Sequence, residues 1–191
     1  MLRVISINRA EVLRRLRALK ADSVSRHVLR SVTFEIQPLR GDYNRSERRY
    51  NTWLRISDDG KSTTLTLRHV PALKSPPKEH VVQVGDFIGT IRIVRMVLHG
   101  VDYSYLEIGR DSYSVAGSTV TIVQWPEMEP ELEITGRSME QLRKLYRDLK
   151  IKGEVIHRLD VPDHVYYKLR GLDFDMIRRQ YNRKLDDLLS E

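Results

Sequence analysis

The chain has 191 residues, of which 40% are hydrophobic and 31% are charged, a balance typical of one globular domain and not of a disordered chain. It has no cysteine, which excludes disulfides and cysteine-ligated zinc. It also has neither a run of roughly 18 apolar residues that could span a membrane nor the apolar core of a signal peptide. We therefore expect a cytoplasmic location without a membrane partner. The net charge of +7 indicates polyanionic ligands, with solvated surface lysines and arginines as the alternative.

The first part of the chain predicts a strand, a helix and then three more strands. Asn8 and Glu11 form a capping box, in which a side-chain acceptor is followed three residues later by a returning carboxylate. Apolar residues then recur at helical spacing, and turn residues such as Gly41 and Gly60 separate the strand-like runs that follow. The predicted strands cover residues 2–7, 28–37, 50–57 and 62–69.

The second part of the chain repeats this order. Asp86 is a candidate N-cap for a helix that reaches about residue 98, and Ser138 with Gln141 caps a later helix. A last helix begins at about residue 173, where apolar residues again recur at helical spacing. The predicted strands cover residues 79–84, 102–108, 111–115, 118–123 and 131–135.

Two copies of a strand, a helix and a run of strands indicate an α+β fold, with an antiparallel barrel or a pair of sheets and the helices outside. Polar and apolar residues alternate along the strands and therefore lie on opposite faces. Arg55, for example, lies between Leu54 and Ile56, and Glu133 follows Leu132. If the helices cover the apolar faces, the polar faces either line a lumen or face solvent, as in an ordinary half-exposed sheet.

Local sequence is similar to that of a known family. Residues 51–56 (NTWLRI) and 60–68 (GKSTTLTLR) resemble its pattern Trp-Leu-Arg-x-Arg, a turn, and Thr-Leu-Thr-x-Lys. Residues 117–126 (GSTVTIVQWP) and 132–136 (LEITG) resemble its Asp-x-Trp-Pro and Leu-Glu-Ile-Glu-Gly segment. Over about residues 1–175 the chain resembles the CYTH proteins, which include class IV adenylyl cyclases, thiamine triphosphatases and inorganic triphosphatases.

The resemblance implies an eight-stranded antiparallel β tunnel with helices packed outside. The tunnel domain would comprise residues 1–175, and residues 176–191 would form a basic C-terminal helix extension. The resemblance also implies that basic side chains in the tunnel bind a triphosphate, while acidic side chains hold Mg²⁺ or Mn²⁺. These residue types suit the chemistry, because guanidinium groups bind phosphate oxygens in pairs and hard divalent cations need carboxylate oxygens.

The basic members of the family site are largely present. The resemblance assigns phosphate binding to Arg3, Arg55, Arg68 and Arg110. Arg68 replaces a lysine and keeps its charge, whereas Ser57 stands where a second arginine of the first basic strand is expected. Arg55 and Arg68 could instead be exposed strand residues that make surface ion pairs.

The acidic members are only partly present. The resemblance assigns metal binding to Glu79 and Glu133, which could alternatively serve as counter-charges for the arginines. The family's N-terminal Glu-x-Glu-x-Lys motif is absent, and three further acidic positions hold Val81, Val123 and Thr135. Acids outside the family pattern that could substitute are Glu35, Glu107, Asp111 and Glu131.

Three functions fit these observations. The first is a metal-dependent triphosphate hydrolase or nucleotide cyclase. The second is a catalytically silent tunnel that binds a triphosphate, a nucleotide or polyphosphate. The third is a non-catalytic basic module that docks on nucleic acid, through the arginine-rich loop 40–49 and the C-terminal helix, or on a macromolecular assembly. Because the arginines are kept while the acids are lost, the sequence favours triphosphate binding by a protein of hydrolase or cyclase ancestry with little or no catalysis.

Overall fold

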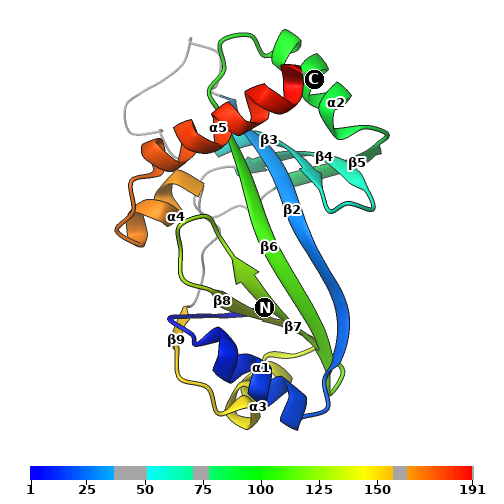
Figure 1. Ribbon diagram of the computed structural model, residues 1–191. Helices are drawn as coiled ribbons and strands as arrows, with labels where there is room; N and C mark the ends of the chain where they lie inside the picture. The colour runs from blue at the N-terminus through cyan, green and yellow to red at the C-terminus, as the bar shows by residue number, and fades with distance from the viewer. Residues whose placement is uncertain (37–50, 71–77, 157–162, 191) are drawn as a thin grey trace. The chain divides into compact units, whose positions relative to one another are not determined.

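The computed structural model describes residues 1–36, 51–70, 78–156 and 163–190 (Figure 1). The chain divides into two compact units, which are treated separately below. Unit 1 contains Met1–Val28 and Glu107–Ile177, and unit 2 contains Leu29–Leu106 and Arg178–Glu191. The predicted division into a domain at 1–175 and an extension at 176–191 stays a prediction.

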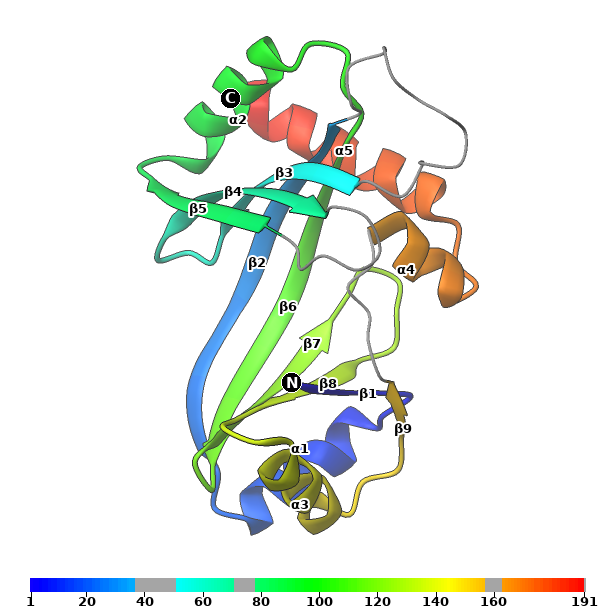
Figure 2. The same cartoon turned by 180° about the vertical axis from the view of Figure 1, so that it is seen from behind.

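The strands form one sheet in the order β5-β4-β3-β2-β6-β7-β8-β1-β9. Figure 2 shows β2, β3, β4 and β5 side by side in this order. β2 and β6 are long strands that contribute residues to both units. The strands are β1 (Leu2–Ile5), β2 (Asp22–Ile36), β3 (Asn51–Asp58), β4 (Thr63–Val70), β5 (Lys78–Val84), β6 (Tyr103–Val115), β7 (Ser118–Gln124), β8 (Glu131–Thr135) and β9 (Glu154–Ile156).

The α+β class and the antiparallel pairing are confirmed, but the sheet differs from the expected eight-stranded tunnel. Over the described part of the chain it has nine strands and is open, with β5 and β9 at its edges. β9 was not predicted and pairs with the outer side of β1, where Arg3 is opposite Ile156. Residues 102–108 and 111–115 were predicted as two strands, but the structure has one continuous strand, β6 (Tyr103–Val115), because Gly109 pairs with Gln124 and continues the ladder.

Three helices begin at the N-caps that the sequence predicts. The side chains of Asn8, Asp86 and Ser138 accept hydrogen bonds from the backbone N–H of the residue three positions later. Each bond satisfies one of the unpaired donors at a helix start. The helices are α1 (Arg9–Ala18), α2 (Phe87–Val97), α3 (Met139–Leu149), α4 (Asp163–Leu169) and α5 (Phe174–Ser190).

In unit 1 the helices α1 and α3 pack on the apolar face of β1, β7 and β8. Val4, Leu132 and Ile134 from the strands are fully buried in this core. Leu16 of α1 and Leu142 of α3 contribute to the same cluster. Since side chains alternate between the two faces of a strand, Arg3 and Glu133 lie on the opposite, polar face.

In unit 2 the helices α2 and α5 pack on the apolar face of β2 and β3. Val32 and Ile56 are fully buried there, against Ile91 of α2 and Leu185 of α5. The arginine side chain of Arg92 in α2 also donates to a backbone carbonyl of α5. The opposite face of this part of the sheet carries the polar residues of β3 and β4.

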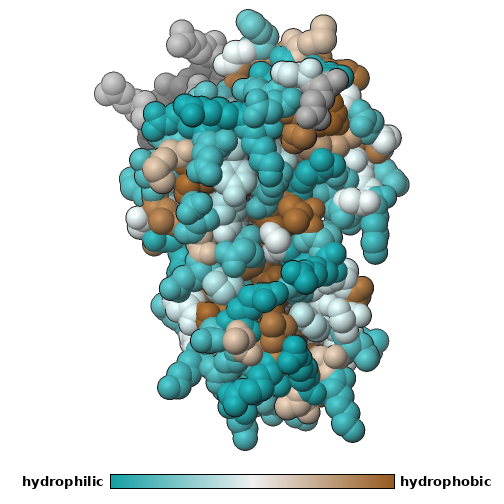
Figure 3. Space-filling model, in the orientation of Figure 1, coloured by the Kyte–Doolittle hydropathy of each residue, from teal (hydrophilic) through white to brown (hydrophobic). Residues whose placement is uncertain are grey.

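The surface is consistent with the charged composition. Figure 3 shows hydrophilic side chains over most of the visible surface, with hydrophobic residues in small, separate patches. Within the described ranges no helix is both long and apolar enough to cross a membrane.

Candidate functional site

The register of unit 2 places Arg55 and Arg68 on the polar face of neighbouring strands. Arg55 in β3 is opposite Thr33 in β2 and Thr66 in β4. Arg68 in β4 is opposite Trp53 in β3. Arg68 is thus directly across from Trp53, and Arg55 is two residues after Trp53 on the same strand and face. Both arginines therefore lie beside the indole of Trp53.

Trp53, Arg55 and Arg68 form a cluster that we call the Trp53 cluster. The guanidinium carbon of Arg55 lies 4.6 Å from the centroid of the Trp53 ring, and that of Arg68 lies 5.6 Å from it. Arg55 also donates from Nε to the hydroxyl of Thr33 at 2.9 Å. A cation near the face of an indole ring is attracted by the ring, so Trp53 helps to hold both guanidinium groups on this face of the sheet. All three side chains are half-buried.

Glu79 is the acid that the register brings next to this cluster. It lies in β5 directly opposite Arg68 and is exposed. Val81, two residues further along the same strand, is 58% exposed and contributes no oxygen. Glu79 is therefore the only carboxylate on this face of β5, and it lies opposite the guanidinium group of Arg68.

Unit 1 contains a second cluster, the Glu133 cluster, made of Glu133, Arg3 and Arg110. Arg3 in β1 is opposite Glu133 in β8 and donates from Nη2 to its Oε1 at 2.6 Å. Arg110 in β6 donates from Nη2 to the other oxygen, Oε2, at 2.8 Å. The Glu133 side chain is only 9% exposed, and those of Arg3 and Arg110 are 14% and 27% exposed. One carboxylate thus bridges two guanidinium groups in a mainly buried position.

Glu131 is a second acid on the polar face of β8, two residues before Glu133. It is fully buried and accepts a hydrogen bond from the hydroxyl of Tyr166 through Oε1. Its other oxygen, Oε2, is buried and has no hydrogen-bond partner among the described residues. Burial raises the pKa of Glu131, and the hydrogen bond from Tyr166 and the charge of Arg3 only partly offset this effect.

Tyr166 also connects this acid to the Glu133 cluster. Its ring centroid lies 5.7 Å from the guanidinium carbon of Arg3. Burial and the hydrogen bond to Glu131 raise the pKa of the Tyr166 hydroxyl, so it stays a donor at neutral pH. The pairing of Tyr166 with Glu131 was not predicted. The sequence feature that could have pointed to Glu131 is the strand alternation, which puts Glu131 and Glu133 on the same face of β8.

The acidic side chains could hold the Mg²⁺ or Mn²⁺ ion that the resemblance implies only if their oxygens were available to it. Both oxygens of Glu133 already accept charge-assisted hydrogen bonds from arginines. Over the described part of the chain no three acidic or histidine side chains come together as a metal site. An octahedral ion needs several oxygen ligands. The side chains present therefore fit arginine pairing better than metal binding.

The structure thus distributes the predicted site residues over two clusters. Arg3, Arg110 and Glu133 meet in unit 1, whereas Arg55 and Arg68 meet in unit 2 beside Glu79. Val123, which stands where a metal-binding acid was expected, is fully buried. The arginine-rich loop 40–49, which we considered for nucleic-acid docking, lies outside the described residues. The assigned roles in phosphate and metal binding stay predictions.

Comparison with known proteins supports the fold. No protein-family model matches the sequence, and no curated protein matches it. Among solved structures, the PH1012 protein from Pyrococcus horikoshii is 17% identical with a TM-score of 0.56, covering 80% of this chain and 93% of that chain. A protein from Vibrio parahaemolyticus, provisionally described as an adenylate cyclase, is 12% identical with a TM-score of 0.55, covering 83% and 92%.

A third solved structure is similar over almost its whole length. It is HpAC1 from Hippeastrum, provisionally described as an adenylyl cyclase and reported to have a dominant triphosphatase activity. It is 16% identical with a TM-score of 0.53, and the match covers 91% of this chain and 97% of that chain. At these identities the likeness concerns the fold. It supports the α+β fold with a large antiparallel sheet and helices that the resemblance to CYTH proteins predicts.

Proposed function

We propose that this chain is a CYTH-like protein that binds a triphosphate, a nucleotide or polyphosphate through the arginines of its polar sheet faces, with little or no turnover. The observation that carries the proposal is the Trp53 cluster, in which two guanidinium groups from neighbouring strands are held on one indole ring. The description of the Hippeastrum protein as a triphosphatase supports the choice of a triphosphate as the ligand.

The clusters suit a chain of phosphate groups. A triphosphate carries about four negative charges, and each arginine offers bidentate donors that stay charged at every accessible pH. Half-buried positions strengthen these contacts, because screening by water and salt is weaker there than at an exposed site. Arg55 and Arg68 would bind phosphate oxygens through their guanidinium groups.

Within unit 1, Arg3 and Arg110 would form a separate group of phosphate donors that exchanges partners when a phosphate binds. Their guanidinium groups share the single carboxylate of Glu133, and the arginines have further N–H donors for phosphate oxygens. When no ligand is bound, the negative charge of Glu133 would partly neutralise the two arginines and so reduce the cost of burying them. In this proposal Glu133 is a counter-charge that competes with the ligand.

Little catalysis is expected from this arrangement. Phosphoryl transfer depends on metal ions that neutralise charge as it shifts during the displacement. Glu79 and Glu133 would be the acids available to Mg²⁺ or Mn²⁺, but each is placed beside arginine. Val81, Val123 and Thr135 add no carboxylate. The proposed function is therefore binding, with hydrolase or cyclase chemistry as the ancestral activity.

The test is a calorimetric titration with tripolyphosphate. Arg55→Ala and Arg68→Ala should each weaken binding by about 1–3 kcal/mol, the range for charge-assisted hydrogen bonds. Arg143→Ala removes the same charge from an exposed position on α3 and should change the affinity far less. Equal losses in all three variants would mean that the affinity comes from diffuse surface charge, and the proposal would then be wrong.

A further inference from the structure

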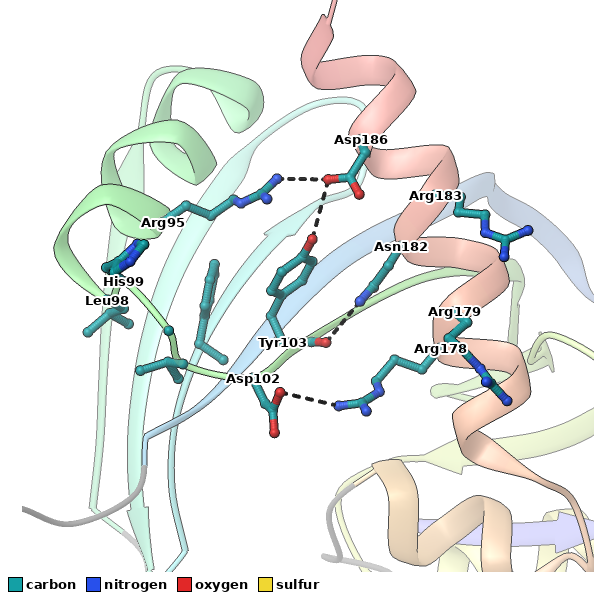
Figure 4. A pocket seen from close by; sticks show the side chains of 13 residues that line it. Arg95, Leu98, His99, Asp102, Tyr103, Arg178, Arg179, Asn182, Arg183 and Asp186 are labelled. Atoms are coloured by element: carbon teal, nitrogen blue, oxygen red, sulfur yellow. Dashed lines mark hydrogen bonds and ion pairs between the residues drawn. The ribbon is translucent and has the colours of Figure 1, made fainter. Parts of the chain in front are cut away.

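Unit 2 contains a cavity of about 590 Å³ between the end of α2, the start of β6 and α5 (Figure 4). We call it the α2–α5 cavity. Its volume is within the range of sites for small organic ligands. The strand and helix ends that form it belong to one compact unit, and a hydrogen bond from Asn182 of α5 to the backbone carbonyl of Tyr103 ties α5 to β6.

Basic side chains dominate the polar part of the lining. Four arginines are present, Arg95 from α2 and Arg178, Arg179 and Arg183 from α5, against two aspartates. His99 adds a further nitrogen donor at the end of α2. A concave site with an excess of one charge focuses its electrostatic potential and raises the local concentration of the opposite ion. The lining therefore favours an anion.

The two aspartates are engaged to different extents. Asp186 accepts from Arg95 at 2.9 Å and from the hydroxyl of Tyr103 at 3.3 Å (Figure 4). Asp102, in contrast, lies 3.9 Å from Arg178, at the limit of an ion pair, and its side chain is 78% exposed. Such an exposed, long pair contributes little free energy. A bound anion can therefore replace Asp102 at the Arg178 guanidinium with little loss.

Apolar side chains supply the rest of the lining. Leu98, Val101 and Tyr103 contribute carbon surface, and the ring of Tyr103 is in tilted contact with that of the buried Phe34, with centroids 5.7 Å apart. A free phosphate ion would make no use of this wall. A ligand with both a phosphate group and a planar ring would use the arginines and the apolar wall together.

The cavity is separate from the Trp53 cluster. Phe34 is opposite Leu54 in the sheet, whereas the next residue back, Thr33, is opposite Arg55. Neighbouring residues of a strand point to opposite faces. The α2–α5 cavity therefore lies on the helix-covered face of the unit 2 sheet, and Arg55 and Arg68 lie on the other face.

We propose that the α2–α5 cavity is a second ligand site, which binds a phosphate ester of the nucleotide class. Arg178 and its neighbours on α5 hold the phosphate, and the base or a comparable ring lies against the apolar wall. This inference is independent of triphosphate binding by the Trp53 cluster, because it depends on different residues on the opposite face of the sheet.

The probe is AMP, which carries one phosphate and one planar ring, titrated into the full chain by calorimetry. Arg178→Ala should weaken AMP binding about tenfold, the loss expected for one charge-assisted contact. Asp102→Asn should strengthen it about two- to threefold, because the competing carboxylate is removed. Opposite effects of two substitutions at one ion pair cannot come from a general loss of folding.

The controls separate this site from the remaining positive charge. Lys184→Ala removes a charge from α5 outside the cavity lining, and Arg55→Ala alters the other face of the sheet. Both should leave AMP affinity within about twofold. Equal losses for Arg178→Ala and Lys184→Ala, loss of AMP binding in Arg55→Ala, or no AMP binding by the unaltered chain would overturn the proposal. Inorganic phosphate that binds as tightly as AMP would overturn the assignment to the nucleotide class.

Discussion

The substitution Glu133→Gln separates the two roles considered for this residue. It removes a negative charge and keeps the size and one acceptor oxygen of the side chain. In the structure Arg3 and Arg110 donate to the two oxygens of Glu133 at 2.6 and 2.8 Å. The substitution therefore leaves two guanidinium groups close together, with one oxygen for one of them and a competing amide donor for the other.

The expected loss of stability follows from the burial of this cluster. Removing one partner from a fully buried ion pair costs about 3–5 kcal/mol. The three side chains here are 9–27% exposed, and glutamine keeps one hydrogen bond, so we expect a smaller loss of about 2–3 kcal/mol. For a chain of this size the melting temperature should fall by about 4–12 °C.

The same substitution should strengthen ligand binding. A carboxylate that competes with a phosphate for the same guanidinium groups also repels it, and removing this charge should favour binding by about 1 kcal/mol. Glu133→Gln should then bind tripolyphosphate roughly fivefold more tightly. A less stable protein with a higher ligand affinity is the signature of a counter-charge that competes with the ligand.

Stability is measured by urea unfolding monitored by tryptophan fluorescence, and affinity by calorimetry with and without Mg²⁺. Glu129→Gln makes the same chemical change at an exposed position and should alter neither quantity appreciably. If Glu133→Gln left stability unchanged and weakened Mg²⁺-dependent binding, Glu133 would be a metal ligand and our interpretation of the cluster would be refuted.

Two further predictions concern the buried acid beside this cluster. Tyr166→Phe removes the hydroxyl that donates to Glu131 and should destabilise the protein by about 1–3 kcal/mol in urea unfolding, since it leaves a buried acceptor unpaired. A loss below about 0.5 kcal/mol, the size typical of a surface substitution, would contradict the pairing. Burial raises the folded-state pKa of Glu131, so the stability that its protonation contributes is present below the unfolded pKa and is lost as pH rises through the folded pKa. Glu131→Gln should therefore gain stability relative to the unaltered chain as the pH rises above about 4, the ordinary pKa of a glutamate, and parallel pH profiles of the two proteins would refute this reasoning.

The sequence predicted local structure well where short-range signals dominate. The N-caps at Asn8, Asp86 and Ser138 depend on residues three positions apart, and all three form the expected hydrogen bonds. The alternation around Arg55 and Leu54 also predicted which strand face the helices cover, because strand periodicity depends only on neighbouring residues.

Features that depend on distant residues were less predictable. The strand β9 has only three residues and forms because it pairs with the edge of β1 that β8 does not occupy. The composition of these three residues does not reveal this pairing. The partner of Glu131 is Tyr166, which lies 35 positions away. The stacking of Arg68 on Trp53 likewise depends on the register of β3 and β4, which was set by the whole hairpin.

The measurement that tests the central claim most directly is the release of phosphate from tripolyphosphate under conditions where calorimetry shows the protein to be saturated. The assay is run with Mg²⁺ and with Mn²⁺, on the unaltered chain and on Glu133→Gln. We predict saturable binding with turnover far below the roughly 10 per second of a median enzyme. Fast metal-dependent release that Glu133→Gln abolishes would contradict the account, because it would make Glu133 part of a working metal site.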